Sequence, residues 1–105
     1  MHIQIVEYGL KDINDADYRS ACDGLARVLA GVPGLISMAW LADERTNTYG
    51  GVYTWVDRDA MEAYLRSDIF NAVAADPDLV DISSRDFEAL EGPSRTTYAL
   101  ADAPS

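Results

Sequence analysis

The segment "GLISMAWLADERTNTYGGVYTWV", residues 34–56, decides the fold, because it reads as two strands joined by a polar turn. Both halves are rich in β-branched and aromatic residues, and "DERTNT" at 43–48 supplies the turn. Two adjacent glycines, Gly50 and Gly51, interrupt the second half among its aromatics. Glycine weakens a strand and marks a position where another group needs the space. The pair therefore predicts close packing, either of the core or of a ligand.

A turn centred near the middle of "DERTNT" sets the register of this hairpin. Alternation then gathers the bulky side chains on one face and small or aliphatic side chains on the other. The facing pairs expected on the bulky face are Trp40–Gly51, Met38–Tyr53 and Ile36–Trp55. We expect Gly51 to leave room for the Trp40 indole, and Gly50 to admit another element on the opposite face.

The rest of the chain supplies the elements on either side of the hairpin. Period-two and period-3.6 patterns predict a strand at 2–8, a helix at 15–31, a helix at 58–67, a short helical turn at 69–75 and a strand at 79–90. The order β-α-β-β-α-β is that of the ferredoxin-like fold, an α+β fold with an antiparallel sheet.

Polar residues at the predicted helix ends indicate where each helix begins. Asn14 or Asp15 can cap the first helix, Asp57 the second, and Asp68 the short helical turn. Gly24 is unusual because it lies inside a helix, where glycine costs about 1 kcal/mol relative to alanine. We expect another backbone to approach closely there.

Length and composition indicate one domain. The chain has 105 residues, of which 49% are hydrophobic, so residues 1–105 form a single domain with a packed core. Residues 92–105 form a tail whose "TTYAL" is expected to be a short edge strand or an arm. The net charge of -10 argues against nucleic acid and anionic membrane surfaces as partners. The apolar residues on both faces of the hairpin strands predict a homodimer.

The scarcity of histidine and cysteine excludes several kinds of site. His2 and Cys22 are the only residues of their types, so we expect no metal site, no cofactor and no cysteine–histidine pair. The glycines do not follow a phosphate-binding pattern. With no disulfide, no leader and no apolar run of membrane length, the sequence predicts a cytoplasmic protein.

The aromatic side chains are the remaining candidates for function. They form either a core packed under the helices or the walls of a pocket for a planar aromatic molecule. The candidate substrate-binding residues are Met38, Trp40, Tyr53, Trp55, Tyr64 and Phe87. Arg85 shares a strand face with Phe87, so it either stabilises a bound anion or pairs with an acid at the edge.

The stretch "VPGLISMAWLADERTNTYGGVYTWVDRDAMEAYL", residues 32–65, resembles the YdhR-type putative monooxygenases of the dimeric α/β-barrel superfamily. The shared features are "PG" before the second strand, a tryptophan late in it, a charged turn, "GGVY", and an acidic cap before "AYL". The resemblance implies a dimer whose two sheets form a barrel. It also implies a relation to cofactor-free monooxygenases that oxidise phenolic or anthrone-like rings.

Two departures bear on the chemistry that the resemblance implies. Members of the family have a lysine where this chain has Met38, which makes a softer and more apolar wall. Haem-degrading relatives on this fold hold iron with a histidine, and His2 is the one histidine here. The sequence therefore argues against haem.

Three functions stay open on these grounds. The first is a cofactor-independent monooxygenase acting on a small electron-rich aromatic substrate, with Arg85 and Trp40 as candidate catalytic residues. The second is a non-catalytic protein that binds a small aromatic molecule. The third is a structural dimer whose aromatics are only core.

Overall fold

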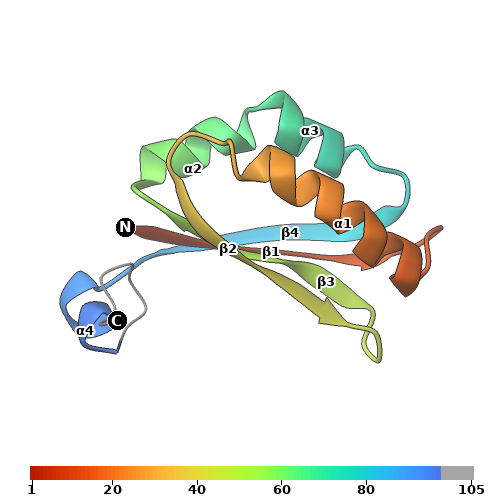
Figure 1. Ribbon diagram of the computed structural model, residues 1–105, viewed down its shortest axis with the longest axis horizontal. Helices are drawn as coiled ribbons and strands as arrows, with labels where there is room; N and C mark the ends of the chain where they lie inside the picture. The colour runs from red at the N-terminus through yellow and green to blue at the C-terminus, as the bar shows by residue number, and fades with distance from the viewer. Residues whose placement is uncertain (98–105) are drawn as a thin grey trace.

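The computed structural model describes residues 1–97 of the chain. Its elements are β1 (His2–Leu10), α1 (Asp15–Leu29), β2 (Leu35–Asp43), β3 (Thr48–Trp55), α2 (Arg58–Leu65), α3 (Asp68–Ala74), β4 (Leu79–Glu88) and α4 (Glu91–Thr96). The four strands form one antiparallel sheet in the order β2-β3-β1-β4. Helices α1, α2 and α3 cover one face of it (Figure 1). This confirms the predicted ferredoxin-like α+β fold.

Helices α1, α2 and α3 begin at polar caps, as the sequence indicated. Asn14 caps α1 by accepting a hydrogen bond from the Asp17 N–H at 2.8 Å. Asp57 caps α2 through Asp57 Oδ1 and the Ala60 N–H, also at 2.8 Å. The predicted cap of α3 was wrong by one residue. Ser67 is the N-cap, and Asp68 is the first helical residue, where a negative charge is favourable.

The hairpin of β2 and β3 follows the predicted register except at one end. Met38 pairs with Tyr53 and Trp40 with Gly51, and this face of the sheet meets the helices. The register shifts between Leu35 and Ser37, so Leu35 faces Trp55 and the expected pair of Ile36 with Trp55 was wrong. One extra residue in a strand turns the following side chains to the other face. That residue is Ile36, which is 36% exposed.

The two glycines of β3 leave room for different neighbouring groups. A Cβ on Gly51 would overlap the terminal methyl group of Met38, so Met38 rather than the Trp40 indole occupies that space. Gly50 has a φ of 145°, a backbone conformation that residues with a side chain rarely adopt. A Cβ added at Gly50 would also overlap the Val6 carbonyl oxygen of β1. The expected element on the opposite face is therefore not what approaches Gly50; the close neighbour is the backbone of the adjacent strand β1.

Two further expectations turn out differently. Nothing lies within 4 Å of the position where a Cβ of Gly24 would be, so the predicted close approach at this residue was wrong. Thr96 ends helix α4 and Thr97 follows in a turn, so these two residues of "TTYAL" are not in an edge strand. The remaining three lie outside the described residues. Helix α4 lies beyond the end of the sheet, beside the N-terminus (Figure 1).

Aromatic rings fill the core between β3 and α2. Trp55 is fully buried, stacks on Tyr53 at 5.8 Å between ring centroids, and packs against Tyr64 at 5.2 Å. Its indole N–H donates to Gln4 Oε1 at 3.0 Å, and Gln4 Nε2 donates to Ser84 Oγ at 3.0 Å. The buried amide of Gln4 therefore satisfies the polar edge of the indole.

Replacing Gln4 by leucine should destabilise the fold by about 1–3 kcal/mol, because the Trp55 N–H would be left buried without an acceptor. Urea unfolding measures the change. In a Trp55→Phe background there is no indole N–H, so the same substitution should cost much less. Equal costs in the two backgrounds would show that the hydrogen bond contributes nothing.

Candidate functional site

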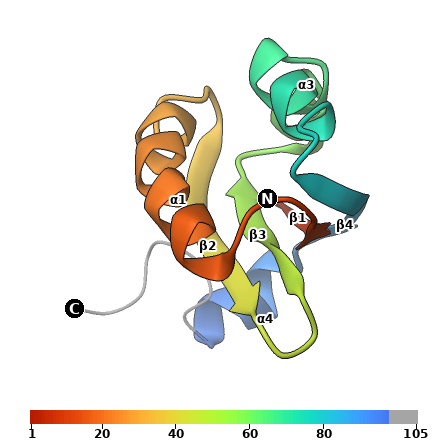
Figure 2. The same cartoon turned by 90° about the vertical axis from the view of Figure 1, so that its right-hand side faces the viewer.

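Two hollows lie between α1 and the other helices on the helix-covered face of the sheet. Figure 2 shows α1 on one side of this face and α3 on the other. The first, called the tyrosine hollow below, has a volume of about 160 Å³ and is lined by Tyr8, Ile13, Tyr18, Ala21, Cys22, Leu25, Val73, Asp76, Asp78 and Leu79. The second has about 240 Å³ and lies between the end of α1 and α2, with Tyr64 in its wall.

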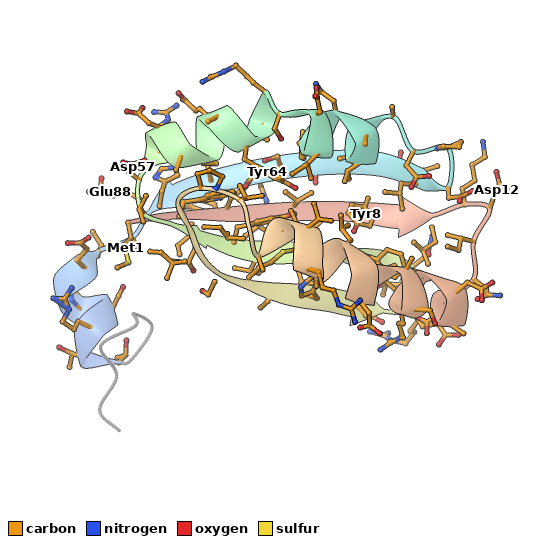
Figure 3. All side chains as sticks on the ribbon, turned by 45° about the horizontal axis from the view of Figure 1, so that its top comes forward. Met1, Tyr8, Asp12, Asp57, Tyr64 and Glu88 are labelled. Atoms are coloured by element: carbon orange, nitrogen blue, oxygen red, sulfur yellow. The ribbon has the colours of Figure 1, made fainter. Side chains whose placement is uncertain are left out.

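A pair of hydroxyl groups lies in the tyrosine hollow. The Tyr8 and Tyr18 oxygens are 2.5 Å apart, and both side chains are 8% exposed. The Tyr18 ring packs edge-on against the Tyr49 ring, with 5.0 Å between the ring centroids. The Tyr49 hydroxyl in turn donates a hydrogen bond to Asp15. Tyr8 comes from β1 and Tyr18 from α1, so the fold itself brings the pair together (Figure 3 shows Tyr8 between the helices).

The environment keeps these groups protonated at neutral pH. Burial raises the pKa of Tyr8. Burial, reinforced by the hydrogen bond with Tyr8, raises the pKa of Tyr18. Burial also raises the pKa of the Cys22 thiol, by more than the hydrogen bond with Tyr18 lowers it. The hydroxyl pair thus keeps both protons, and the O–H that is not used between the two tyrosines suits an oxygen anion on a ligand.

The remaining walls are apolar except at one side. Leu25 and Leu79 contribute hydrocarbon surface, while Asp76 and Asp78 come from the turn between α3 and β4. The Asp78 N–H donates to Asp76 Oδ1 at 2.9 Å, which fixes the turn. An apolar cavity of about 150 Å³ accommodates benzene. The tyrosine hollow is therefore large enough for one aromatic ring.

The predicted site residues on the helix side do not all share one cavity, and none of them lines the tyrosine hollow. Met38 and Trp40 line a separate cleft of about 250 Å³ at the edge of the sheet, between β2 and α1. Tyr53 and Trp55 are core residues, 5% and 0% exposed. Tyr64 is also buried, and its hydroxyl lies 3.3 Å from that of Tyr53.

Arg85 and Phe87 lie on the other face of the sheet. They pair with Ile5 and Ile3 of β1, whose side chains point away from the helices. Arg85 Nη2 contacts Glu7 Oε1 at 3.3 Å, and Phe87 is 51% exposed. Within one chain the sheet separates both residues from the tyrosine hollow.

The sequence analysis did not predict the pairing of Tyr8 with Tyr18, although the sequence pattern around each tyrosine indicates an inward-pointing side chain. Tyr8 follows the alternation of Val6 in the first strand, and Tyr18 and Cys22 are four residues apart on the apolar stripe of the first helix. Both patterns indicate side chains that point into the same layer. Combining them would have predicted the meeting of the two tyrosines.

The described residues were also compared with the requirements of a metal site, a histidine-containing site and a membrane-spanning helix. Residues 1–97 contain no group of three or more His, Cys, Asp or Glu side chains placed to hold a metal ion. His2 Nε2 lies 2.6 Å from Asp86 Oδ2 at the surface of the sheet. Over the same residues, no helix is both long and apolar enough to cross a membrane.

Solved structures with a similar fold include several oxygenases. An antibiotic biosynthesis monooxygenase of Deinococcus radiodurans, described as putative, is 17% identical with a TM-score of 0.69, and the match covers 85% of this chain and 92% of that one. A variant of SnoaB, a cofactor-independent oxygenase of Streptomyces nogalater, is 21% identical with a TM-score of 0.65 and coverage of 85% and 93%. A variant of MhuD with two manganese protoporphyrin IX molecules bound per active site is 17% identical, with a TM-score of 0.67 and coverage of 86% and 95%. No curated protein sequence matches the chain.

At these identities the solved structures establish the fold alone. Family membership rests instead on the sequence match, which spans nearly the whole domain rather than the hairpin region only. A family model described as "Putative mono-oxygenase ydhR" matches residues 3–100, so the chain belongs to that family.

Proposed function

We propose that the protein is a cofactor-independent monooxygenase that oxidises a small electron-rich aromatic substrate, such as a phenol, a quinol or an anthrone-like ring, in the tyrosine hollow. The observation that carries the proposal is the protonated hydroxyl pair of Tyr8 and Tyr18 inside a hollow of one-ring size. Family membership and the likeness to SnoaB support the reaction type.

The reaction needs little from the protein beyond binding and charge stabilisation. A deprotonated substrate transfers one electron to O₂, and the resulting radical and superoxide combine at a ring carbon. The peroxide then loses water, which leaves one oxygen atom as a ring carbonyl and the other in water. The substrate supplies all four electrons that reduce O₂, and it loses two hydrogen atoms to the water, so no external reductant enters the balance.

The tyrosine hollow can contribute in two ways. One hydroxyl of the Tyr8–Tyr18 pair donates to the other, and the remaining O–H can donate to the substrate oxygen as its negative charge develops. The hydrocarbon walls of Leu25 and Leu79 reduce the contact of a bound ring with water, which strengthens that hydrogen bond and protects the radical pair. Neither contribution requires a histidine or a metal ion.

The test is oxygen consumption by purified protein with hydroquinone or an anthrone, with EDTA present and no flavin or metal added. We expect consumption above the rate of autoxidation and no effect of His2→Ala. Loss of activity in EDTA that a divalent ion restores would contradict the proposal. Binding without oxygen consumption would favour the alternative, a non-catalytic protein that binds small aromatic molecules.

We also propose a homodimer formed through the uncovered face of the sheet. In one chain no described helix lies over this face (Figure 1). Ile3, Ile5 and Val52 lie on it at paired positions, together with the exposed ring of Phe87. Exposed apolar surface of this kind marks an interface.

The variant Phe87→Lys should weaken the dimer, because it places a charge in the proposed interface. Light scattering at micromolar concentration should show a mass near twice the 11.5 kDa monomer for the wild type and a lower average mass for the variant. Val28→Lys is the matched control, since Val28 is 50% exposed but belongs to α1. A wild-type mass near 11.5 kDa would refute the dimer.

A further inference from the structure

We propose that the tyrosine hollow selects aromatic substrates that carry a protonated amine, with the ring against the Tyr8–Tyr18 pair and the amine towards Asp76 and Asp78. The choice of this hollow rests on the proposed function, whereas the charge preference rests on the residues that line it. The two can therefore be tested separately.

The lining residues have charge of one sign. Asp76 and Asp78 are the charged residues of the hollow, and no lysine or arginine lines it. Both aspartates are half-buried. Neither carboxylate forms an ion pair with any residue in 1–97. A half-buried carboxylate without a counter-charge favours a cationic ligand group, and it disfavours an anionic one.

The hollow has two polar features, the tyrosine hydroxyl pair and the two aspartates. Together they suit one molecule with an oxygen anion at one end and an amine at the other. The hydroxyl pair has one O–H that is not used in its mutual hydrogen bond, and this O–H can donate to an oxygen anion on the ring. The carboxylates lie on the turn between α3 and β4, where Asp76 already accepts the Asp78 N–H and the Asp78 carbonyl accepts the Lys11 N–H. These backbone hydrogen bonds hold the turn in place before any ligand binds.

The negative charge of Asp76 reaches Tyr8. Burial raises the pKa of Tyr8 most, and the charge of Asp76 is the smallest of the contributions that raise this pKa. A ligand in the hollow would experience the same charge. A carboxylate on the ligand would meet two like charges, while an ammonium group would meet two opposite ones.

The experiment compares three phenols of similar size by calorimetry at pH 7: tyramine, 4-ethylphenol and 3-(4-hydroxyphenyl)propanoate. We expect tyramine to bind about tenfold or more tightly than 4-ethylphenol, and the carboxylate to bind more weakly than both. In Asp76→Asn and Asp78→Asn the preference for tyramine should shrink several-fold. Asparagine keeps an acceptor for the Asp78 N–H, and thermal melting checks that each variant folds.

Asp59→Asn is the matched control, because it changes the net charge equally and lies exposed on α2. It should leave the preference unchanged. A preference that Asp59→Asn reduces as much as Asp76→Asn does would show that the overall charge of -10 is responsible, and would overturn the inference. Equal binding of the three phenols, or no binding of any, would also overturn it.

The proposed function has its own readout in the oxygen assay with hydroquinone. Hydroquinone oxidation without a charge preference would refute this inference and leave the monooxygenase proposal standing. A charge preference that depends on Asp76, without oxygen consumption in the presence of any phenol or hydroquinone, would support this inference and refute the monooxygenase proposal.

Discussion

Replacing Gly50 by alanine should lower the melting temperature by at least about 10 °C, the largest stability effect that we expect from a single methyl group. Two physical reasons act together. The φ of 145° is a conformation that alanine adopts only with strain, at a cost of roughly 1–3 kcal/mol. The added Cβ would also overlap the Val6 carbonyl oxygen, and β1 is a central strand of the sheet with little freedom to move.

The control is Gly51→Ala, which places the same methyl group one residue further along the strand. Its Cβ would meet the terminal methyl group of Met38, which can turn aside. We expect a change within about 1 kcal/mol, because Met is flexible and tolerates repacking. Thermal melting at one protein concentration compares the two variants, since a dimer would make the melting temperature depend on concentration. Equal effects of both substitutions would contradict this account of the paired glycines.

The hairpin shows how far local pattern predicts the fold. The turn and the alternation were sufficient to pair Met38 with Tyr53 and Trp40 with Gly51. The prediction failed at Ile36, where the strand has a bulge. A bulge adds one residue to one strand of a pair, and that residue is of a type common in regular strands, so the composition does not reveal it. Alternation alone carries no signal for such an irregularity, so Trp55 was paired with Ile36 instead of Leu35.

The candidate site was harder to predict, because it depends on which sheet face meets the helices. Arg85 follows the same alternation whether its face is covered or open, and only the packing of whole elements decides. The structure pairs it with Glu7 on the open face, apart from the tyrosine hollow. Tyr8 and Tyr18 come from different elements, so their 2.5 Å contact has no counterpart in any single stretch of sequence.

The aromatic residues of β3 illustrate a related ambiguity. Tyr53 and Trp55 have the composition of a ligand-binding wall, yet a buried amide and neighbouring rings satisfy them. A small domain needs large side chains to bury enough apolar surface, and aromatics supply it. Sequence alone could not separate these two uses, because both require the same residues on the same face.

Tyr8→Phe should reduce kcat for hydroquinone or anthrone oxidation about 100-fold, because it breaks up the hydroxyl pair that we propose donates to the developing charge. The substitution keeps the ring, so the walls of the hollow and its volume are preserved. KM should change little, since the lost hydrogen bond matters most once the substrate is an anion. Stability should fall by about 1 kcal/mol, the net value of one buried hydrogen bond.

Tyr49→Phe separates this catalytic role from the loss of a buried hydroxyl. Tyr49 is 1% exposed and its hydroxyl also donates a hydrogen bond, to Asp15, but it does not line the hollow. We expect Tyr49→Phe to have a similar effect on melting and to retain most of kcat. Parallel losses of kcat in both variants would mean that the tyrosines act through packing alone. A loss seen with Arg85→Gln or Trp40→Phe, with Tyr8→Phe still active, would place the reaction on the open sheet face or in the β2 cleft instead.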